Sequence, residues 1–333
     1  GGTAAQLPAR VVPAAIGEDM TGSIRFPAAL CGVAGLRPST YTIENALRGV
    51  NRKRYSDIGV VATPPQPQET FGPMARTIAD VAFLDQIVTG EPTKAVDIGR
   101  ARVAIPNAAY WDQDFVDPGV AAVMREALDR LRRAGATLVE IDFDAVRAIY
   151  DAKLAAALPF LDKRLPEWLA AHLPNVSEDM IFARRTGTID RSGGVSGAKT
   201  GPPASGAERR ETLLSAQARI KAVFRDLRID AIASPTSPIT APPLRRDGEK
   251  AGQTIVMNGK TVSQVWTLAR NIFWGPPLGL PGLSIPAGLA SGLPVGLQLE
   301  GLPGSDTALL GLGIAIERIL GPLEPPSFKH FEV

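Results

Sequence analysis

Residues 102–141 carry the pattern that most restricts the fold of this chain. A short apolar segment, Arg102–Ile105, is followed by Asp117-Pro118, an N-cap residue and a proline at the first helical position. Gly135 ends the helix that they begin, and Thr137–Ile141 is the next apolar segment. The apolar residues of this helix are three and four positions apart: Val120, Val123, Met124, Ala127, Leu128 and Leu131. Strand, helix and strand in this order predict a parallel strand pair in an α/β fold.

Other segments extend this prediction to a mixed, mostly parallel twisted β-sheet with helices on both faces. Further strands are expected at Val11–Ile16, as a buried strand, at Ile229–Ser234, and on either side of Gly288–Gly292 within Ile285–Gly301. The last two strands would form an antiparallel element, because a short glycine-bearing turn joins them. Helices are expected near Pro27–Leu30, from Thr77 to Val88, over Asp144–Leu173, Ser177–Arg185 and Glu208–Leu227, and after Ser305.

The composition is that of an ordinary globular protein, long enough for one α/β domain or two smaller ones, and we expect a single domain over residues 1–333. Apolar residues make up 45% of the chain and charged residues 21%, which are ordinary values for such a protein. The length is sufficient for a large core. Residues 145–225 are expected to form a variable helical insertion. Its part that is rich in Gly, Ser and Pro, residues 186–206, is expected to be an exposed, mobile loop.

Charge and apolarity argue against two classes of partner. The net charge is +2, from 36 basic and 34 acidic residues, so we expect no nucleic-acid binding. Residues 271–299 carry no charge and are long enough to raise the question of a membrane segment. Prolines interrupt any helix there, at Pro276, Pro277, Pro281, Pro286 and Pro294. We therefore expect buried strands and turns in this stretch and no contact with a membrane.

The content of cysteine and histidine limits both the compartment and the cofactors. The single cysteine, Cys31, cannot form an internal disulfide, which fits a reducing compartment, and we expect a cytoplasmic protein. Its place in an apolar run predicts a small buried side chain rather than a nucleophile. Because His, Cys and Asp residues are nowhere clustered at the spacing of metal ligands, no metal or other cofactor is expected.

The chemistry of the chain is concentrated at Ser23. This serine directly follows Gly22, in a loop that also contains Asp19 and Arg25. A serine on a tight, glycine-bearing turn can expose its oxygen while neighbouring backbone N–H groups converge on one point. Acyl transfer needs this combination of nucleophile and oxyanion hole. We expect Asp19 and Arg25 to pair across the neck of the loop and to fix its shape.

A serine nucleophile needs a base, and the histidines of this chain do not supply an obvious one. His172 lies in a stretch predicted to be helical, and His330 lies in a proline-rich, charged tail. Neither is near a convincing acid motif. A Ser-His-Asp triad is therefore disfavoured.

The segment Gly17–Pro38 resembles the active-site segment of the amidase signature family, usually Gly-Thr-Asp-Thr-Gly-Gly-Ser-Ile-Arg followed by a Pro-Ala pair. Further blocks are similar to the family and stand in its order: Ala28–Pro38, Phe71–Thr77 with Ala79-Asp80, Asp230–Pro238, and Leu280–Gln298. The resemblance covers most of the chain and is poor over residues 145–225 and 241–265. It implies the mixed α/β fold of that family.

The resemblance implies that Ser23 is the nucleophile and that the backbone N–H groups of Met20, Thr21, Gly22 and Ser23 form the oxyanion hole. It gives Asp19 and Arg25 the role of loop support. Thr21 departs from the family pattern, which has glycine at this position. A β-branched threonine fits there if its φ is negative and is strained if its φ is positive.

In this family the base is a lysine that acts through a second serine held in a cis peptide. Burial keeps such a lysine neutral. Both residues precede the nucleophile in family order, whereas the first lysine of this chain is Lys53. Gly1-Gly2 resembles the end of the glycine-rich run that carries the bridging serine. The resemblance thus implies an N-terminally truncated amidase domain, with both partners upstream of residue 1, and we expect these 333 residues alone to be inactive.

Three functions stay open. The first is an amidase that hydrolyses a small-molecule carboxamide through an acyl-enzyme on Ser23, with resemblance to members acting on aryl-acetamides such as indoleacetamide or mandelamide. Aromatic residues that could line its pocket are Tyr110, Trp111, Phe160, Trp168, Phe273 and Trp274. The second is the glutamine-hydrolysing subunit of a tRNA-dependent amidotransferase, although its usual Ser-Ser-Leu-Asp-Gln is replaced by Pro67–Phe71. The third is a non-catalytic remnant or binding module. A homodimer is also left open.

Overall fold

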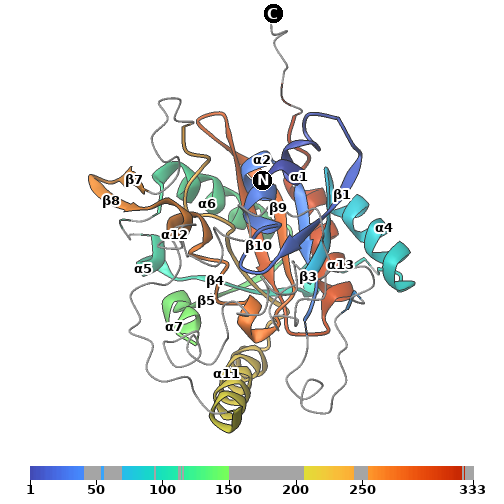
Figure 1. Cartoon of the computed structure of the whole chain (residues 1–333), viewed down its shortest axis with the longest axis vertical. Coiled ribbons are helices and arrows are strands. Elements are labelled where there is room, and N and C mark those ends of the chain that lie inside the picture. The colour runs from blue at the N-terminus through green and yellow to red at the C-terminus, as the bar shows by residue number, and fades with distance from the viewer. Residues whose placement is uncertain are drawn as a thin grey trace, which may run out of the picture.

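The computed structural model describes residues 1–40, 54–55, 70–93, 95–111, 114, 116–149, 206–243, 254–324 and 326. Strands from both halves of this part of the chain form one eight-stranded sheet, and helices cover both of its faces (Figure 1). The sheet strands are β1 (Ala14–Asp19), β2 (Ala34–Arg37), β3 (Thr70–Ala75), β4 (Arg102–Pro106), β5 (Thr137–Ile141), β6 (Ala231–Pro235), β9 (Gly282–Ala290) and β10 (Leu293–Glu300). Their spatial order is β1-β3-β2-β9-β10-β6-β4-β5. The hairpin of β7 (Thr254–Met257) and β8 (Lys260–Ser263) lies apart from this sheet.

The sheet is mixed, as predicted, but the expectation of mostly parallel pairing is wrong for the described strands. β4 pairs in parallel with β5 and with β6, which confirms the prediction from residues 102–141. The other pairs in the sheet are antiparallel. The reason is clearest for β9 and β10, which are joined by Ser291 and Gly292, both with positive φ (50° and 81°). Two such residues favour the tight turn of a β-hairpin, which can only join antiparallel strands.

The first strand differs from its prediction in position and burial. The expected buried strand Val11–Ile16 is instead β1, Ala14–Asp19, and among the described strands it pairs only with β3. Val11 is 69% exposed and Ile16 is 51% exposed. An apolar sequence alone does not show that a strand will lie at the edge of a sheet, where one side has no neighbour.

One face of the sheet is covered by α4 (Ile78–Thr89), α6 (Pro118–Arg133) and α13 (Asp306–Leu320), which share one apolar core with it. The predicted N-caps are confirmed for the first two of these helices. Thr77 Oγ1 accepts the Asp80 N–H at 3.0 Å, and Asp117 Oδ1 accepts the Val120 N–H at 3.0 Å. Ser305 precedes α13 as expected, but its side chain makes no capping bond.

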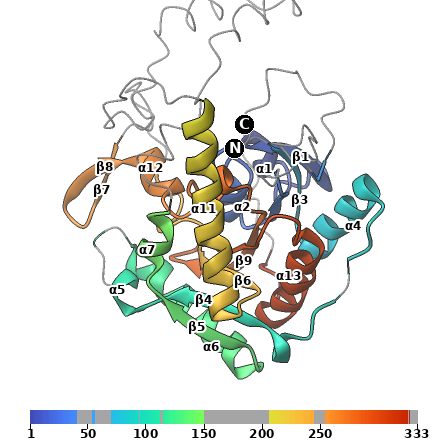
Figure 2. The same ribbon diagram turned by 90° about the horizontal axis from the view of Figure 1, so that it is seen from below.

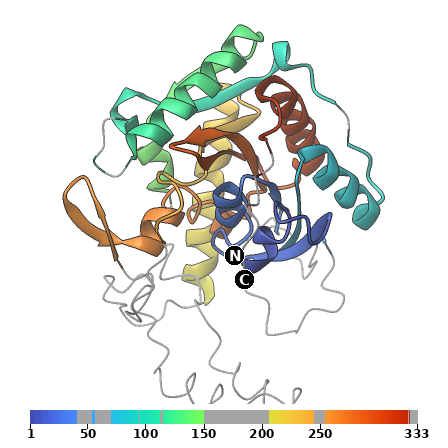
Figure 3. The ribbon, with the colours of Figure 1, turned by 90° about the horizontal axis from the view of Figure 1, so that it is seen from above.

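The opposite face holds two further groups of helices. α2 (Arg25–Cys31) packs on β2, β9 and β10 near the middle of the sheet, and α1 (Gly2–Ala5) contacts α2 and the edge strand β1. Figure 3 shows α2 on the other side of β9 and β10 from α6 and α13. Beside them, α7 (Phe143–Arg147) and α11 (Gly206–Leu227) share a second apolar core (Figure 2). Helices on both faces confirm the predicted architecture.

Shorter helices complete the described part of the chain: η1 (Ile98–Arg100), α5 (Ala108–Trp111), α12 (Gln264–Ala269) and η2 (Pro276–Leu278). The helices predicted near Pro27–Leu30 and over Glu208–Leu227 correspond to α2 and α11. Of the predicted insertion, residues 150–205 lie outside the described residues, and with them the helix at Ser177–Arg185 and nearly all of the loop at 186–206.

Candidate active site

Ser23 lies on the connection between β1, which ends at Asp19, and α2, which begins at Arg25. The side chain of Ser23 is exposed, whereas both neighbouring residues, Gly22 and Ile24, are buried. Gly22 has a φ of +113°, a conformation that residues with a Cβ rarely adopt. An added Cβ there would also lie 2.8 Å from Ile272 Cγ2. The turn that presents Ser23 therefore requires glycine at position 22.

Thr21 fits this turn without backbone strain. In the described part of the chain, the non-glycine residues with positive φ are Arg10, Arg228, Asn258 and Ser291, and Thr21 is not among them. The departure from the family pattern at Thr21 is therefore compatible with the local backbone, because the position that needs glycine is Gly22.

Asp19 organises the turn from inside the protein. Its carboxylate accepts the N–H of Gly22 at 2.7 Å and the N–H of Ile24 at 3.4 Å. It also forms a two-point ion pair with Arg25, with Nε–Oδ2 at 3.0 Å and Nη2–Oδ1 at 3.3 Å. The predicted pairing of Asp19 and Arg25 is confirmed. Both side chains are fully buried, so the pair is part of the core and not a solvated contact at the neck of the loop.

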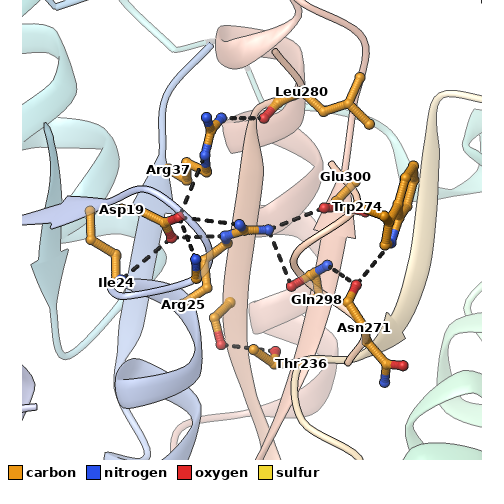
Figure 4. A network of polar contacts seen from close by, with 12 residues as sticks. Asp19, Ile24, Arg25, Arg37, Thr236, Asn271, Trp274, Leu280, Gln298 and Glu300 are labelled. Atoms are coloured by element: carbon orange, nitrogen blue, oxygen red, sulfur yellow. Dashed lines mark hydrogen bonds and ion pairs between the residues drawn. The ribbon is translucent and has the colours of Figure 1, made fainter. Parts of the chain in front are cut away.

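The pair belongs to a larger buried network that the sequence did not reveal (Figure 4). Arg37 Nε lies 3.5 Å from Asp19 Oδ1, and Arg37 Nη1 donates to the Leu280 carbonyl at 2.6 Å. On its other side, Arg25 Nη1 contacts Glu300 Oε1 at 3.1 Å and Gln298 Oε1 at 3.5 Å. Two arginines and two carboxyl groups therefore lie behind the turn that carries Ser23.

A signal for part of this network was present in strand β10. Leu297 and Leu299 point into the core shared with α6 and α13, while the alternate residues Gln298 and Glu300 face α2. Polar residues on one face of an otherwise apolar strand indicate a buried polar partner, and that partner is Arg25.

Burial raises the pKa of the carboxyl groups in this network, whereas the neighbouring arginine charges lower it. Burial by itself raises the pKa of Asp19, but the charges of Arg25 and Arg37 and the hydrogen bonds from Arg25 and Gly22 bring that pKa below its usual value. Burial raises the pKa of Glu300 to about 8, despite the opposing charges of Arg25 and Arg37. Burial also lowers the pKa of Arg37 to about 10. The two carboxyl groups of the network therefore shift in opposite directions, with the pKa of Asp19 lowered by its cationic partners and the pKa of Glu300 raised by burial.

Asn271 links this network to the aromatic residues. Its backbone carbonyl accepts Gln298 Nε2 at 3.2 Å and Trp274 Nε1 at 2.9 Å. Its side-chain Nδ2 donates to Tyr110 Oη at 2.7 Å and to the Pro235 carbonyl at 2.8 Å. Figure 4 shows Gln298 between Arg25 and Asn271.

Of the aromatic residues predicted as possible pocket walls, Tyr110 and Trp274 are core residues, whereas Trp111 and Phe273 are partly buried. Tyr110 and Trp274 are buried and pack edge-on against Phe143, with ring centroids 5.3 and 6.3 Å away. Trp111 packs on Tyr110 at 5.0 Å, and Phe273 packs on Trp266 at 5.5 Å. The physical reason is that large aromatic side chains fill the space between α7, α11 and the sheet. Phe160 and Trp168 lie outside the described residues.

The remaining sequence candidates are not at this turn. Cys31, at the other end of α2, is a free thiol that is half-buried rather than fully buried, and burial raises its pKa. His172 and His330 fall outside the described residues. Within the described ranges, three or more His, Cys, Asp or Glu side chains nowhere gather closely enough to hold a metal ion. No helix in the same ranges is both long and apolar enough to cross a membrane.

Comparison with known proteins identifies the family of this chain. A family model described as Amidase matches residues 1–310. The chain belongs to the amidase family. An indoleacetamide hydrolase from Agrobacterium vitis is 31% identical over 330 residues, covering 96% of this chain and 66% of that protein. A glutamyl-tRNA(Gln) amidotransferase subunit from Anaeromyxobacter sp. (strain K) is 33% identical over 359 residues, covering 98% of this chain and 67% of that protein.

Solved structures of family members share the fold. The peptide amidase from Stenotrophomonas maltophilia has a TM-score of 0.67 at 22% identity, covering 100% of this chain and 66% of that chain. The glutamyl-tRNA(Gln) amidotransferase subunit from Thermotoga maritima has a TM-score of 0.62 at 25% identity, covering 95% of this chain and 64% of that chain. The chain spans 66% of the length of the Agrobacterium vitis hydrolase.

Proposed function

We propose that this chain carries the nucleophile of an amide hydrolase and that the nucleophile is Ser23. The observation that supports this most directly is the difference in exposure between Ser23 and the two residues that hold its turn. The Ser23 side chain is exposed, while Asp19 and Arg25, which hold the turn in shape, are fully buried. A nucleophile must reach its substrate and yet be held in one geometry, and this arrangement meets both needs.

In the proposed reaction, a base removes the Ser23 hydroxyl proton and Oγ attacks the carbonyl carbon of the amide. The C–N bond then breaks, the amine leaves with a proton, and water hydrolyses the acyl-enzyme to the acid. The base and its bridging serine are the lysine and serine implied by the family resemblance, from sequence that precedes Gly1. The Agrobacterium vitis hydrolase is longer than this chain, which covers 66% of it. The lysine and the bridging serine are therefore proposed residues and do not belong to the described structure.

The hydrogen bonds of the turn narrow the set of donors proposed for the oxyanion hole. Of its four predicted donors, Gly22 already donates its N–H to Asp19 Oδ1 at 2.7 Å. A donor engaged in this way serves the shape of the turn. The proposed donors to the developing oxyanion are therefore the backbone N–H groups of Met20, Thr21 and Ser23.

An aryl-acetamide is the proposed substrate class, because an indoleacetamide hydrolase is 31% identical to this chain and matches it over 96% of its length. Glutamine is the second candidate, since a glutamyl-tRNA(Gln) amidotransferase subunit is 33% identical. We also propose a cytoplasmic location, because the single cysteine is a free thiol. A homodimer stays a prediction.

The test uses the protein encoded by the complete gene, including all sequence before Gly1. Ammonia release is measured with indole-3-acetamide, mandelamide and glutamine, and serine reactivity with a fluorophosphonate probe. Ser23→Ala is expected to abolish both signals. The control is Ser291→Gly, which removes an exposed serine on the β9–β10 turn at a φ of 50° that suits glycine. A wild-type protein that neither hydrolyses an amide nor takes the probe would favour the non-catalytic alternative.

A further inference from the structure

Glu300 occupies a position that is costly for an acidic side chain. It is the last residue of β10, near the middle of the sheet, and it is 1% exposed. Burying a carboxyl group in this way is unfavourable unless its oxygens have partners. The described partner is Arg25, whose Nη1 lies 3.1 Å from Glu300 Oε1.

The backbone around this pair leaves room for it at two separate places. A Cβ at Gly275 would lie 2.3 Å from Glu300 Oε1, and a Cβ at Gly282 would lie 2.9 Å from Arg25 Nη1. Neither glycine has a positive φ, so neither is required by its backbone conformation. Glycine at both positions is instead explained by the space that the Glu300–Arg25 pair needs.

Arg25 connects Glu300 to the turn that carries Ser23. One end of its guanidinium contacts Glu300, and Nε and Nη2 contact Asp19 at 3.0 and 3.3 Å. Asp19 in turn accepts the N–H of Gly22 at 2.7 Å. The route from Glu300 to the turn thus consists of three consecutive polar contacts between buried groups.

We propose that Glu300 is a positioning residue for Ser23: its carboxyl oxygen fixes the far end of Arg25, so that the near edge of the guanidinium keeps Asp19 and the Gly22 turn in place. This inference rests on the proposed function of Ser23 and deepens it. The charged groups that face Glu300 are Arg25, Arg37 and Asp19. In the protonated form Glu300 still offers Arg25 a carbonyl oxygen, and glutamine offers the same oxygen without the ability to ionise.

Two substitutions separate the acceptor oxygen from the charge. Glu300→Leu removes the oxygen at similar volume, and Glu300→Gln keeps it. Hydrogen exchange of the Gly22 and Ile24 N–H groups reports on the turn whether or not the protein hydrolyses an amide. We expect Glu300→Leu to speed this local exchange at least about tenfold and Glu300→Gln to leave it unchanged at pH 6. For the complete protein, we expect Glu300→Leu to lower kcat at least about tenfold with a much smaller change in KM.

The pH dependence provides a readout that a merely structural role would not change. Because the pKa of Glu300 is raised by burial, ionisation favours any opening that exposes the carboxylate. Exchange of the Gly22 and Ile24 N–H groups in the wild type should therefore rise relative to Glu300→Gln as the pH increases from 6 to 9. Glu317→Gln is the matched control, since burial also raises the pKa of Glu317, which accepts the Ile78 N–H at 2.7 Å on the other face of the sheet.

Two results would overturn the inference: unchanged exchange at Gly22 and Ile24 in Glu300→Leu, or exchange that rises equally across the whole sheet. Failure of the proposed function looks different. In that case the wild-type protein lacks amide hydrolysis and probe labelling, while the exchange measurements still decide whether Glu300 holds the turn.

Discussion

Asp19 and Arg25, only six residues apart, meet in the core as a two-point ion pair with contacts of 3.0 and 3.3 Å, and the turn between them carries Ser23. The pair has no access to water. Ion pairs of this kind contribute little net stability over an apolar core, but the loss of one partner leaves an uncompensated charge. The shape of the candidate active site is therefore coupled to the stability of the sheet beneath it.

Asp19→Asn should be strongly destabilising. The substitution leaves Arg25 and Arg37 with one buried carboxylate fewer, and we expect the free energy of unfolding to fall by about 3–5 kcal/mol in urea denaturation. Asp226→Asn removes an acid of the same type from an exposed ion pair, with Arg225 at 2.8 Å, and should change little. Equal effects of the two substitutions would contradict a structural role for the buried pair.

A side chain should destabilise the protein at position 22, whereas removal of the side chain should destabilise it at position 21. Gly22→Ala forces a Cβ into a φ of +113° and toward Ile272, at a cost of about 1–3 kcal/mol, and should also lower Ser23 reactivity. Thr21→Gly should lower the free energy of unfolding by about 0.5–1 kcal/mol, because glycine only increases the conformational entropy of the unfolded chain. Thermal melts and probe labelling of both variants check this. A stabilised Thr21→Gly variant would show that threonine is strained there.

Gly72→Ala should disrupt the pairing of β2 and β3. A Cβ at Gly72 would lie 2.0 Å from the Leu36 carbonyl oxygen, which belongs to the backbone and cannot rotate away. We expect a loss of about 3 kcal/mol in urea denaturation. Gly2→Ala is the control, because a Cβ there meets nothing within 4 Å. A normal melting temperature for Gly72→Ala would mean that the two strands can separate without cost.

The stability of the protein should depend on pH through Glu300. Its pKa rises from 4.5 in the unfolded chain to about 8 in the folded protein. Between pH 4.5 and about 8, the folded state therefore keeps a proton on Glu300 that the unfolded chain has lost. The stability that this proton provides is fully present below pH 4.5 and is lost as the pH rises through about 8. The difference in unfolding free energy between wild type and Glu300→Gln should change by about 1 kcal/mol per pH unit in this window. Parallel pH profiles for the two proteins would contradict the raised pKa.

Local signals in the sequence predicted the elements whose ends depend on adjacent residues. Thr77 and Asp117 cap their helices as expected, and the strand, helix and strand of residues 102–141 pair in parallel. The turn at Ser23 and the pairing of Asp19 with Arg25 could also be predicted, because all of their residues lie within one short segment.

Features set by contacts between distant segments could not be predicted in the same way. The apolar residue Ile16 gave no sign that its strand would lie at the edge of the sheet. Tyr110 and Trp274 looked equally suited to a pocket and to a core, and only the packing around Phe143 distinguishes the two. Glu300 was missed because its partner, Arg25, is nearly the whole chain away in sequence.

The position of β2 has a consequence for the order in which the protein can fold during synthesis. Residues 35–37 of β2 pair with residues 282–284 of β9, and Arg25 needs Glu300, at the end of the next strand. The ribosome releases the segment that contains Ser23 long before it makes these partners. A nascent chain of this protein therefore leaves one edge of β2 without β9, and Arg25 without Glu300, through most of its translation, a period in which chaperones commonly protect such segments. The turn that carries Ser23 can reach its final geometry only when the C-terminal hairpin has emerged, so the topology of the sheet couples completion of this turn to the synthesis of β9 and β10.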